Sequence, residues 1–216
     1  MIFRELLFYF LIFIGFLPVF IYLTKGSKKI NYINFLLPYC ILMFVGGIYE
    51  LVITGVFKVG STPWFRIYTL LEFFTLLYFY NKLLGKNKLF LFLGILYIIT
   101  YLYQIYEWIY FPRIGFNIIS LKVESVSMVL ISSIIWFVEA FKKMDETSFY
   151  VNPVFYIIAA FLLYFCSTFI VFIVTDYMKQ YKMNIRSFYM VIFYAALVLR
   201  TTLLVVFLKA SNSKKN

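Results

Sequence analysis

The chain has 216 residues, of which 64% are hydrophobic, 24% aromatic and only 13% charged. A soluble domain of this size exposes too much of its surface to hide so many apolar side chains, so the composition excludes an ordinary soluble fold and indicates a protein embedded in lipid. The net charge of +11 does not indicate nucleic-acid binding, because the basic residues lie in short gaps between apolar runs, as membrane-flanking charges do.

Seven apolar runs follow one another along the chain, each close to the roughly 20 residues that a membrane-spanning helix needs. They cover about residues 6–24, 32–55, 63–84, 89–110, 118–141, 152–175 and 187–208. The gaps are short, so neighbouring helices should pack antiparallel and no soluble domain fits between them. The sequence therefore predicts an all-α polytopic membrane protein, residues 1–216 forming one seven-helix transmembrane domain with 209–216 as a short cytoplasmic tail.

The placement of lysine and arginine predicts the orientation. The gaps after the first, third and fifth runs, together with the tail, hold 11 lysines. The opposite side holds 8 basic residues, or 6 when Arg66 and Lys122, which fall inside predicted helices, are left out. Because basic loops remain in the cytoplasm, we expect the N-terminus outside and the C-terminus inside.

Glu72 is the deepest acid of the chain. It lies about nine residues into the third run, roughly 13 Å from its start at 1.5 Å per residue. A charge there costs a few kcal/mol, so such residues usually face a partner or a wet cavity. Tyr68, Thr69 and Thr75 lie four before, three before and three after it, on the same helical face. We interpret this face as ligand-binding, with a structural hydrogen bond or ion pair as the alternative.

The fifth run carries a second polar stripe. Ser120, Glu124 and Ser127 share one helical face through spacings of four and three. Such a stripe should face the interior of the bundle, so we predict that these residues also bind the ligand, with a structural role as the alternative.

Three further polar residues lie near the outer ends of predicted helices. They are Glu50 in the second run and Gln104 and Glu107 in the fourth, within the aromatic stretch YLYQIYEWIY. We include all three in the predicted pocket. Their alternative is plain solvation at the membrane interface, where tyrosine and tryptophan also gather.

Arg200 is the basic counterpart of Glu72. It lies about thirteen residues into the seventh run, at a depth that differs from that of Glu72 by roughly 6 Å. We therefore predict a structural ion pair between Arg200 and Glu72. The alternative is an arginine that extends toward the inner headgroups.

Metal and cofactor chemistry have little support in the sequence. There is no histidine, and Cys40 and Cys166 lie singly within apolar runs, where cysteine is a common packing residue. A zinc site built from histidine and cysteine is therefore excluded in practice. We expect no metal and no cofactor, and we assign no catalytic residue.

Two segments carry a family resemblance: NPVFYIIAAFLLYFCSTFIVF, from Asn152 to Phe172, and YTLLEFFTLLYF, from Tyr68 to Phe79. Both resemble uncharacterised seven-helix membrane proteins of Bacteroidota, which are often found near sensor kinases. The resemblance implies a sensory or regulatory role in a bacterial cytoplasmic (inner) membrane, and no functional residue carries over from it.

Together these features predict an integral membrane sensor or receptor-like protein. An acidic, tyrosine-lined pocket, open to the outer face, would bind a small polar or cationic ligand. Because the chain has no output domain, it would signal to a separate cytoplasmic or membrane partner. Two alternatives stay open, a small-solute transporter that uses intramembrane carboxylates and a carboxylate-dependent intramembrane lipid hydrolase. The lipid bilayer is expected around the protein, and no nucleic acid.

Overall fold

The computed structural model describes residues 2–25, 31–110, 118–143, 151–180 and 188–212. These residues form seven long helices, and none of the residues so described lies in a β-strand. The helices are α1 (Ile2–Lys25), α2 (Asn31–Ile48) continued by the π-helix η1 (Tyr49–Val56), α3 (Thr62–Leu84), α4 (Asn87–Tyr110), α5 (Ile118–Lys143), α7 (Pro153–Gln180) and α8 (Tyr189–Asn212). The all-α prediction is confirmed.

Six of the helices are long and apolar enough to cross a membrane. The remaining one, α3, has 23 residues and is long enough, but it carries Arg66, Glu72 and Lys82 and is the least apolar of the set. The chain is therefore a multi-pass membrane protein in which six predicted spans are matched by strongly apolar helices, while α3 stands apart because of its charges.

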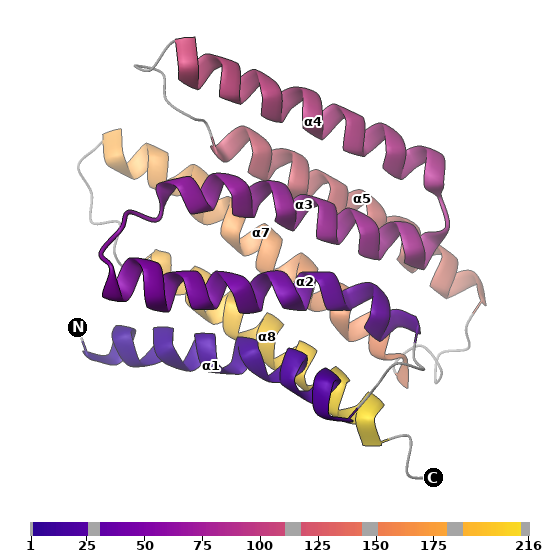
Figure 1. The fold of residues 1–216 in the computed structure, drawn as a ribbon. Helices are drawn as coiled ribbons and strands as arrows, with labels where there is room; N and C mark the ends of the chain where they lie inside the picture. The colour runs from indigo at the N-terminus through magenta and orange to yellow at the C-terminus, as the bar shows by residue number, and fades with distance from the viewer. Residues whose placement is uncertain (1, 26–30, 111–117, 144–150, 181–187, 213–216) are drawn as a thin grey trace.

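Six helices form a closed ring. Neighbouring helices pack in the order α1, α2, α3, α5, α7, α8 and back to α1, whereas α4 packs against α3 and α5 from outside the ring (Figure 1). The most exposed face of the bundle belongs to α4, whose apolar side chains turn mostly outward. Within the ring, α3 packs between α2 and α5, and α4 covers part of its outer face. Other helices therefore surround α3 on several sides, which explains how a charged helix is accommodated.

Local sequence signals determine where several helices begin and end. Pro63 occupies the first turn of α3, and Gly85 ends that helix in the left-handed conformation with φ of 66°. Pro153 begins α7, and the Asn152 side chain accepts a hydrogen bond from the Val154 amide at 2.9 Å. Two ends are longer than predicted: α7 continues to Gln180, and α8 continues through 209–212 of the predicted tail.

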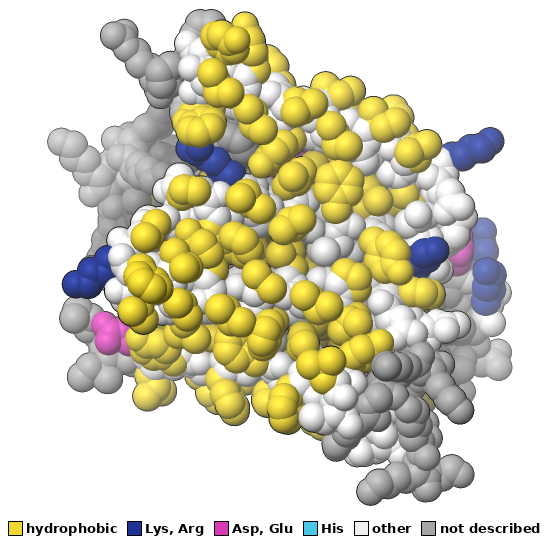
Figure 2. All heavy atoms as spheres, viewed as in Figure 1, with side chains coloured by type: hydrophobic (Ala, Val, Ile, Leu, Met, Phe, Trp, Pro, Cys, Tyr) yellow, Lys and Arg dark blue, Asp and Glu magenta, His cyan; other side chains and the backbone are white. Residues whose placement is uncertain are grey.

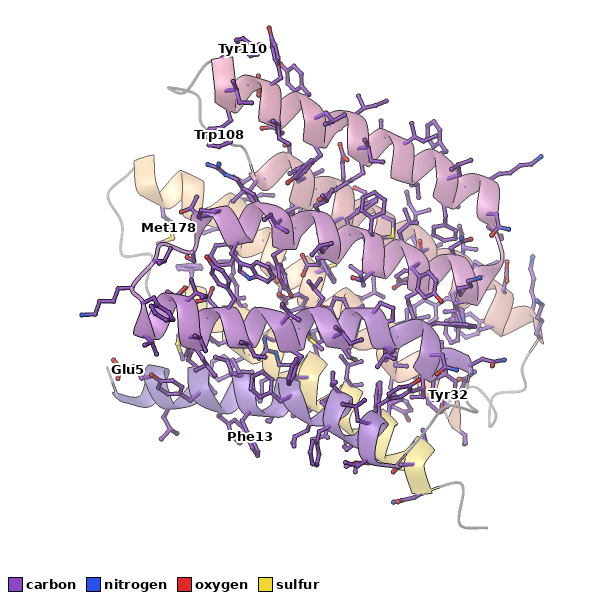
Figure 3. The ribbon with its side chains drawn as sticks, in the orientation of Figure 1. Glu5, Phe13, Tyr32, Trp108, Tyr110 and Met178 are labelled. Carbon is purple, nitrogen blue, oxygen red and sulfur yellow. The ribbon has the colours of Figure 1, made fainter. Side chains whose placement is uncertain are left out.

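The surface follows the pattern expected in lipid. Hydrophobic side chains cover the middle of the face shown in Figure 2, and lysine and arginine lie mainly toward its two ends. Phe13 points away from the bundle, and Trp108 and Tyr110 lie at one end of α4 (Figure 3). Tryptophan and tyrosine are typical of the membrane–water boundary, so this end of α4 fits an interfacial position.

The interior of the ring is packed with aromatic rings over the half where α3 ends. Tyr39 of α2 and Phe79 of α3 both contact Phe161 of α7, with ring centres 5.1 and 5.6 Å apart. Tyr80, beside Phe79, donates to or accepts from Ser133 of α5 at 2.9 Å. All four aromatic side chains are buried, so this half of the bundle has a solid core.

A glycine controls the approach of α1 to α2. A Cβ atom added at Gly47 would lie 2.7 Å from the Phe16 ring and 3.2 Å from Ile12. Small residues at such contacts allow helix backbones to approach closely in membranes. Gly47 therefore allows the close packing of α1 against α2.

We predict that Gly47→Val destabilises the protein by about 1–3 kcal/mol, because the added methyl groups must displace the Phe16 ring from a packed contact. The free energy of unfolding in detergent measures the change. Gly60→Val is the matched control, since a Cβ at Gly60 meets nothing within 4 Å. Equal stability of the two variants would contradict the close α1–α2 contact.

Candidate functional site

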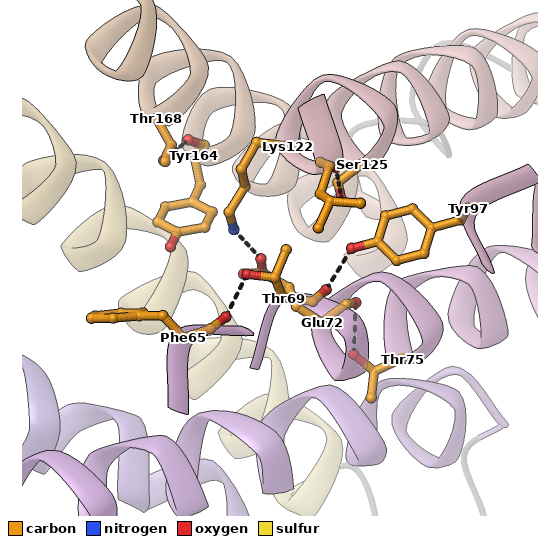
Figure 4. A network of polar contacts seen from close by, with 10 residues as sticks. Phe65, Thr69, Glu72, Thr75, Tyr97, Lys122, Ser125, Tyr164 and Thr168 are labelled. Carbon is orange, nitrogen blue, oxygen red and sulfur yellow. Dashed lines mark hydrogen bonds and ion pairs between the residues drawn. The ribbon is translucent and has the colours of Figure 1, made fainter. Parts of the chain in front are cut away.

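The deepest polar feature of the bundle is an ion pair between α3 and α5. The Lys122 Nζ ammonium donates to Glu72 Oε2, and both side chains are buried, with Glu72 0% exposed (Figure 4). Two charges inside a bundle are tolerable only when each compensates the other, because removing either one from water is costly. The structural alternative for Glu72, an ion pair, is thus the arrangement observed.

The register of α3 and α5 explains why Lys122 is the partner. Two contacts at a constant offset of 53 residues link α5 to α3 and to the short segment that follows it. Tyr80 of α3 contacts Ser133, and Lys86, two residues after the end of α3, pairs with Glu139 at 2.9 Å. The same offset places residue 125 opposite Glu72. Lys122 lies three residues earlier, roughly 4.5 Å along the helix axis, a distance that the four-carbon lysine stem covers.

The hydroxyl groups beside the pair bond to backbone carbonyls rather than to the carboxylate. Thr69 donates to the Phe65 carbonyl at 2.7 Å, and Thr75 to the Glu72 carbonyl at 3.0 Å. Tyr97 of α4 donates to the Thr69 carbonyl at 3.0 Å (Figure 4). The hydroxyls of Thr69 and Thr75 therefore satisfy helix carbonyls, and a ligand-binding role for the two residues stays a prediction.

One oxygen of the Glu72 carboxylate makes no hydrogen bond to the described residues. Glu72 Oε1 is buried and has no hydrogen-bond partner among the residues that the structure describes. Four tyrosines on four helices lie close enough to interact electrostatically with Glu72: Tyr39, Tyr68, Tyr97 and Tyr164. The pair therefore lies among polar aromatic side chains rather than in a purely aliphatic core.

A first cavity of about 310 Å³ opens within the ring, at the end of the bundle where α1, α3 and α8 begin. Its polar lining comes from Glu50, Tyr68, Tyr164 and Arg200, and its walls are otherwise mainly aliphatic and aromatic. Tyr68 lies one turn before Glu72 on α3. Of the residues predicted to bind a ligand, Glu50 and Tyr68 line this cavity.

A second cavity of about 380 Å³ adjoins the first between α3, α5, α7 and α8. Lys122, Thr69 and Thr168 contribute to its lining, and Tyr68 and Tyr164 belong to the walls of both cavities. Phe65 and Ile192 are shared as well, so these four residues lie between the two cavities, with Lys122 in the second cavity and Arg200 in the first.

Arg200 does not pair with Glu72, so that prediction is wrong. Its Nη1 donates to the Leu11 carbonyl of α1 at 2.5 Å. Gly15 makes room for it, since a Cβ there would lie 3.3 Å from Nη1. The reason is topological: α8 packs against α1 and α7, whereas α3 faces α2 and α5. The guanidinium also stays against α1 rather than extending to the inner headgroups.

The predicted stripe on α5 does not face the ring interior. Ser127 is exposed, and Glu124 and Ser120 are half-buried. Glu124 interacts with Thr100 of α4, which lies outside the ring. The face of α5 that turns toward the interior of the ring carries Lys122 and Ser125, both buried. The predicted stripe lies on another face of the same helix.

Gln104 and Glu107 also belong to α4 and line neither cavity. Gln104 is buried, and Glu107 is half-buried and accepts a hydrogen bond from Tyr103. A ligand-binding role for either residue stays a prediction. Sequence analysis placed Lys122 inside a predicted helix but did not recognise it as the partner of Glu72. It also missed Trp64 and Tyr164, which it saw only as members of apolar runs.

Metal ligation has no visible basis in the described ranges, where no group of three histidine, cysteine or acidic side chains could hold an ion. Cys40 is buried and Cys166 half-buried, and both are free thiols.

Fold and site together define an all-helical, multi-pass membrane protein with a carboxylate–ammonium pair inside its bundle. Comparison with known protein families, curated proteins and solved structures finds no match.

We predict that Lys122→Met and Glu72→Leu each lower the free energy of unfolding by about 3–5 kcal/mol, since each strands a buried charge. The double variant should recover most of that loss, because an apolar pair leaves no charge unpaired. Unfolding in detergent micelles measures all three variants.

The solvent-accessible pair between Lys86, which follows α3, and Glu139 of α5 supplies the control. Neutralising it should change stability little, since solvent screens both groups. A double variant at 72 and 122 that is no more stable than the single variants would show that the two residues do not form a pair.

Proposed function

We propose that the protein is a membrane receptor that binds a small ligand in the first cavity and signals to a separate partner at the opposite end of the bundle. The observation that carries the proposal is the asymmetry of the ring interior. Two adjoining cavities that share Tyr68 and Tyr164 lie at the end where α1 begins, while buried aromatic rings from α2, α3 and α7 fill the half beyond. A separate cavity of about 350 Å³ lies at the opposite end, between the start of α7 and the end of α8. A ligand therefore has a place to bind, and the packed half supplies a solid connection to the other end.

Helices α3 and α5 offer the route for a signal. Tyr68 of α3 belongs to the cavity wall, and the ion pair one turn further ties α3 to α5. The same helices are joined again at Tyr80–Ser133, and Lys86, just after the end of α3, pairs with Glu139 of α5. A ligand that displaces Tyr68 would therefore move α3 and α5 as one unit, with the movement emerging at Lys86 and Glu139.

The far end offers a surface for a partner. Exposed lysines gather where α3, α5 and α8 end and α4 begins, and we call this the lysine-rich end: Lys82, Lys86, Lys88, Lys142, Lys143 and Lys209. Such an end favours the cytoplasmic side of a membrane, where an acidic protein surface could dock. We accordingly propose that the N-terminus lies outside and the C-terminus inside.

An N-terminus outside and a C-terminus inside require an odd number of membrane spans. We therefore propose that α3 is the seventh span. Its charges are placed for this, since Glu72 is neutralised inside the bundle and the Arg66 guanidinium lies over the Trp108 ring at 3.8 Å. With the resemblance to proteins found near sensor kinases, this supports a receptor of a bacterial inner membrane.

Transport is the second candidate. A buried carboxylate–ammonium pair beside a cavity is the kind of group that carries protons in membrane transporters. The packed aromatic half favours the receptor. A lipid hydrolase has less support, because Lys122 occupies Glu72 while Glu124 interacts with α4, so the two acids do not form one acid–base site.

We predict that Ala196→Trp, which fills the first cavity, weakens ligand binding more than tenfold and abolishes the response at the lysine-rich end. The probe is a polar small-molecule extract of bacterial cells, added to the protein in nanodiscs. Hydrogen exchange of residues 82–88 should change in the wild type and not in Ala196→Trp. Val198→Trp, on the exposed face of the same helix, is the matched control and should respond like the wild type.

An unchanged exchange pattern at 82–88 in the wild type would contradict the receptor. Accumulation of extract compounds inside proteoliposomes, lost in Glu72→Gln, would favour the transporter instead.

A further inference from the structure

The first cavity contains one acid and one base that do not pair with each other. Glu50 belongs to η1 and Arg200 to α8, and both are half-buried. No salt bridge joins them in the part of the chain that the structure describes, and the guanidinium bonds instead to the Leu11 carbonyl. A cavity with two separated, opposite charges is complementary to a molecule that carries both.

The two charges lie at similar depth on different sides of α1. Gly47 packs against Ile12 and Phe16 of the antiparallel α1, so Glu50, three residues and roughly 4.5 Å further on, lies near the level of Leu11. Arg200 reaches that same level, because it bonds to the Leu11 carbonyl. A ligand of modest size, lying across the bundle, could therefore meet both charges.

The wall beside Glu50 suits an ammonium group. Trp64 stacks on Tyr49 with ring centres 4.8 Å apart and planes 13° apart, and it lies 6.0 Å from the Tyr68 ring. Gly46 makes this possible, since a Cβ there would be 3.2 Å from Tyr68. Aromatic faces next to a carboxylate are the usual receptor for an organic ammonium.

The local backbone places Glu50 at this wall. The chain widens from α-helix to π-helix at Tyr49, directly before Glu50. Short π-helical segments occur frequently at functional sites, because the wider turn redirects a side chain. Across the cavity, Arg200 offers a planar pair of donors that matches a carboxylate.

We propose that the ligand is a small zwitterion with an apolar or aromatic body, of the amino-acid class, with its ammonium at Glu50 and its carboxylate at Arg200. This assignment rests on the receptor function proposed above and names its ligand. A simple amine would leave Arg200 without an anion, and a simple acid would leave Glu50 without a cation. The volume of about 310 Å³ lies at the small end of ligand pockets and fits a single amino acid or a very short peptide.

Three probes with one carbon skeleton test the charges separately. Phenylalanine carries both charges, phenethylamine only the ammonium and 3-phenylpropionate only the carboxylate. Calorimetry with the protein in nanodiscs should give phenylalanine an affinity at least tenfold higher than either analogue. Phenylalanylglycine, added as a fourth probe, distinguishes a free amino acid from a short peptide as the ligand. Tighter binding of either zwitterion than of the two singly charged analogues supports the assignment.

Two variants assign each charge to its residue. Glu50→Gln should remove the preference for phenylalanine over 3-phenylpropionate and keep the preference over phenethylamine. Arg200→Gln should do the reverse. Glu5→Gln, at an exposed carboxylate of α1 that lines neither cavity, is the matched control and should bind like the wild type. Since Arg200 also bonds to α1, the Glu50 variant carries the test if Arg200→Gln does not fold.

Equal affinity of the three probes, tighter binding of a singly charged analogue, or no binding of any zwitterion would overturn the assignment. Those results would leave the receptor proposal standing, because its own failure appears separately, as the loss of the extract-dependent exchange response at residues 82–88.

Discussion

The ion pair between Glu72 and Lys122 constrains the whole bundle. A carboxylate in an otherwise apolar helix cannot face lipid, so α3 must turn it inward and another helix must supply a cation. Lys122 does so from α5, which places α5 beside α3 in the ring and leaves α4, the helix between them in sequence, on the outside. Helix order in space thus follows from one charge that has to be compensated.

The same pair separates the two halves of the ring interior. Toward the start of α1 lie the cavities, with Tyr68 and Tyr164 as their shared wall. Toward the lysine-rich end, the interior is filled by buried aromatic rings such as Tyr39 and Phe161. A binding end and a connecting end are therefore built on the same helices, and α3 and α5, joined at Glu72–Lys122 and at Tyr80–Ser133, run through both.

Much of this architecture could be predicted from the sequence, because the length of each apolar run and the charges that flank it determine where helices lie in a membrane protein. The depth of Glu72 and its need for a partner were also predictable. The identity of the partner was not, since periodicity shows which residues share a helix face but not which neighbouring helix that face meets. Arg200 matched Glu72 in depth, yet its helix lies against α1. The stripe with Glu124 and Ser127 was expected to face the interior of the bundle for the same reason. Nothing in the sequence indicates that α4 lies outside the ring, where it meets Glu124.

The most direct test of the pairing is a solid-state NMR measurement of dipolar coupling between lysine 15Nζ and glutamate 13Cδ in lipid bilayers. A strong coupling should disappear in Lys122→Met, while the coupling that remains should disappear in Lys86→Met, which removes the exposed pair with Glu139. If all strong coupling is lost in Lys86→Met alone and Lys122→Met leaves the spectrum unchanged, Glu72 has no lysine partner and the central interaction of the bundle is not the one described.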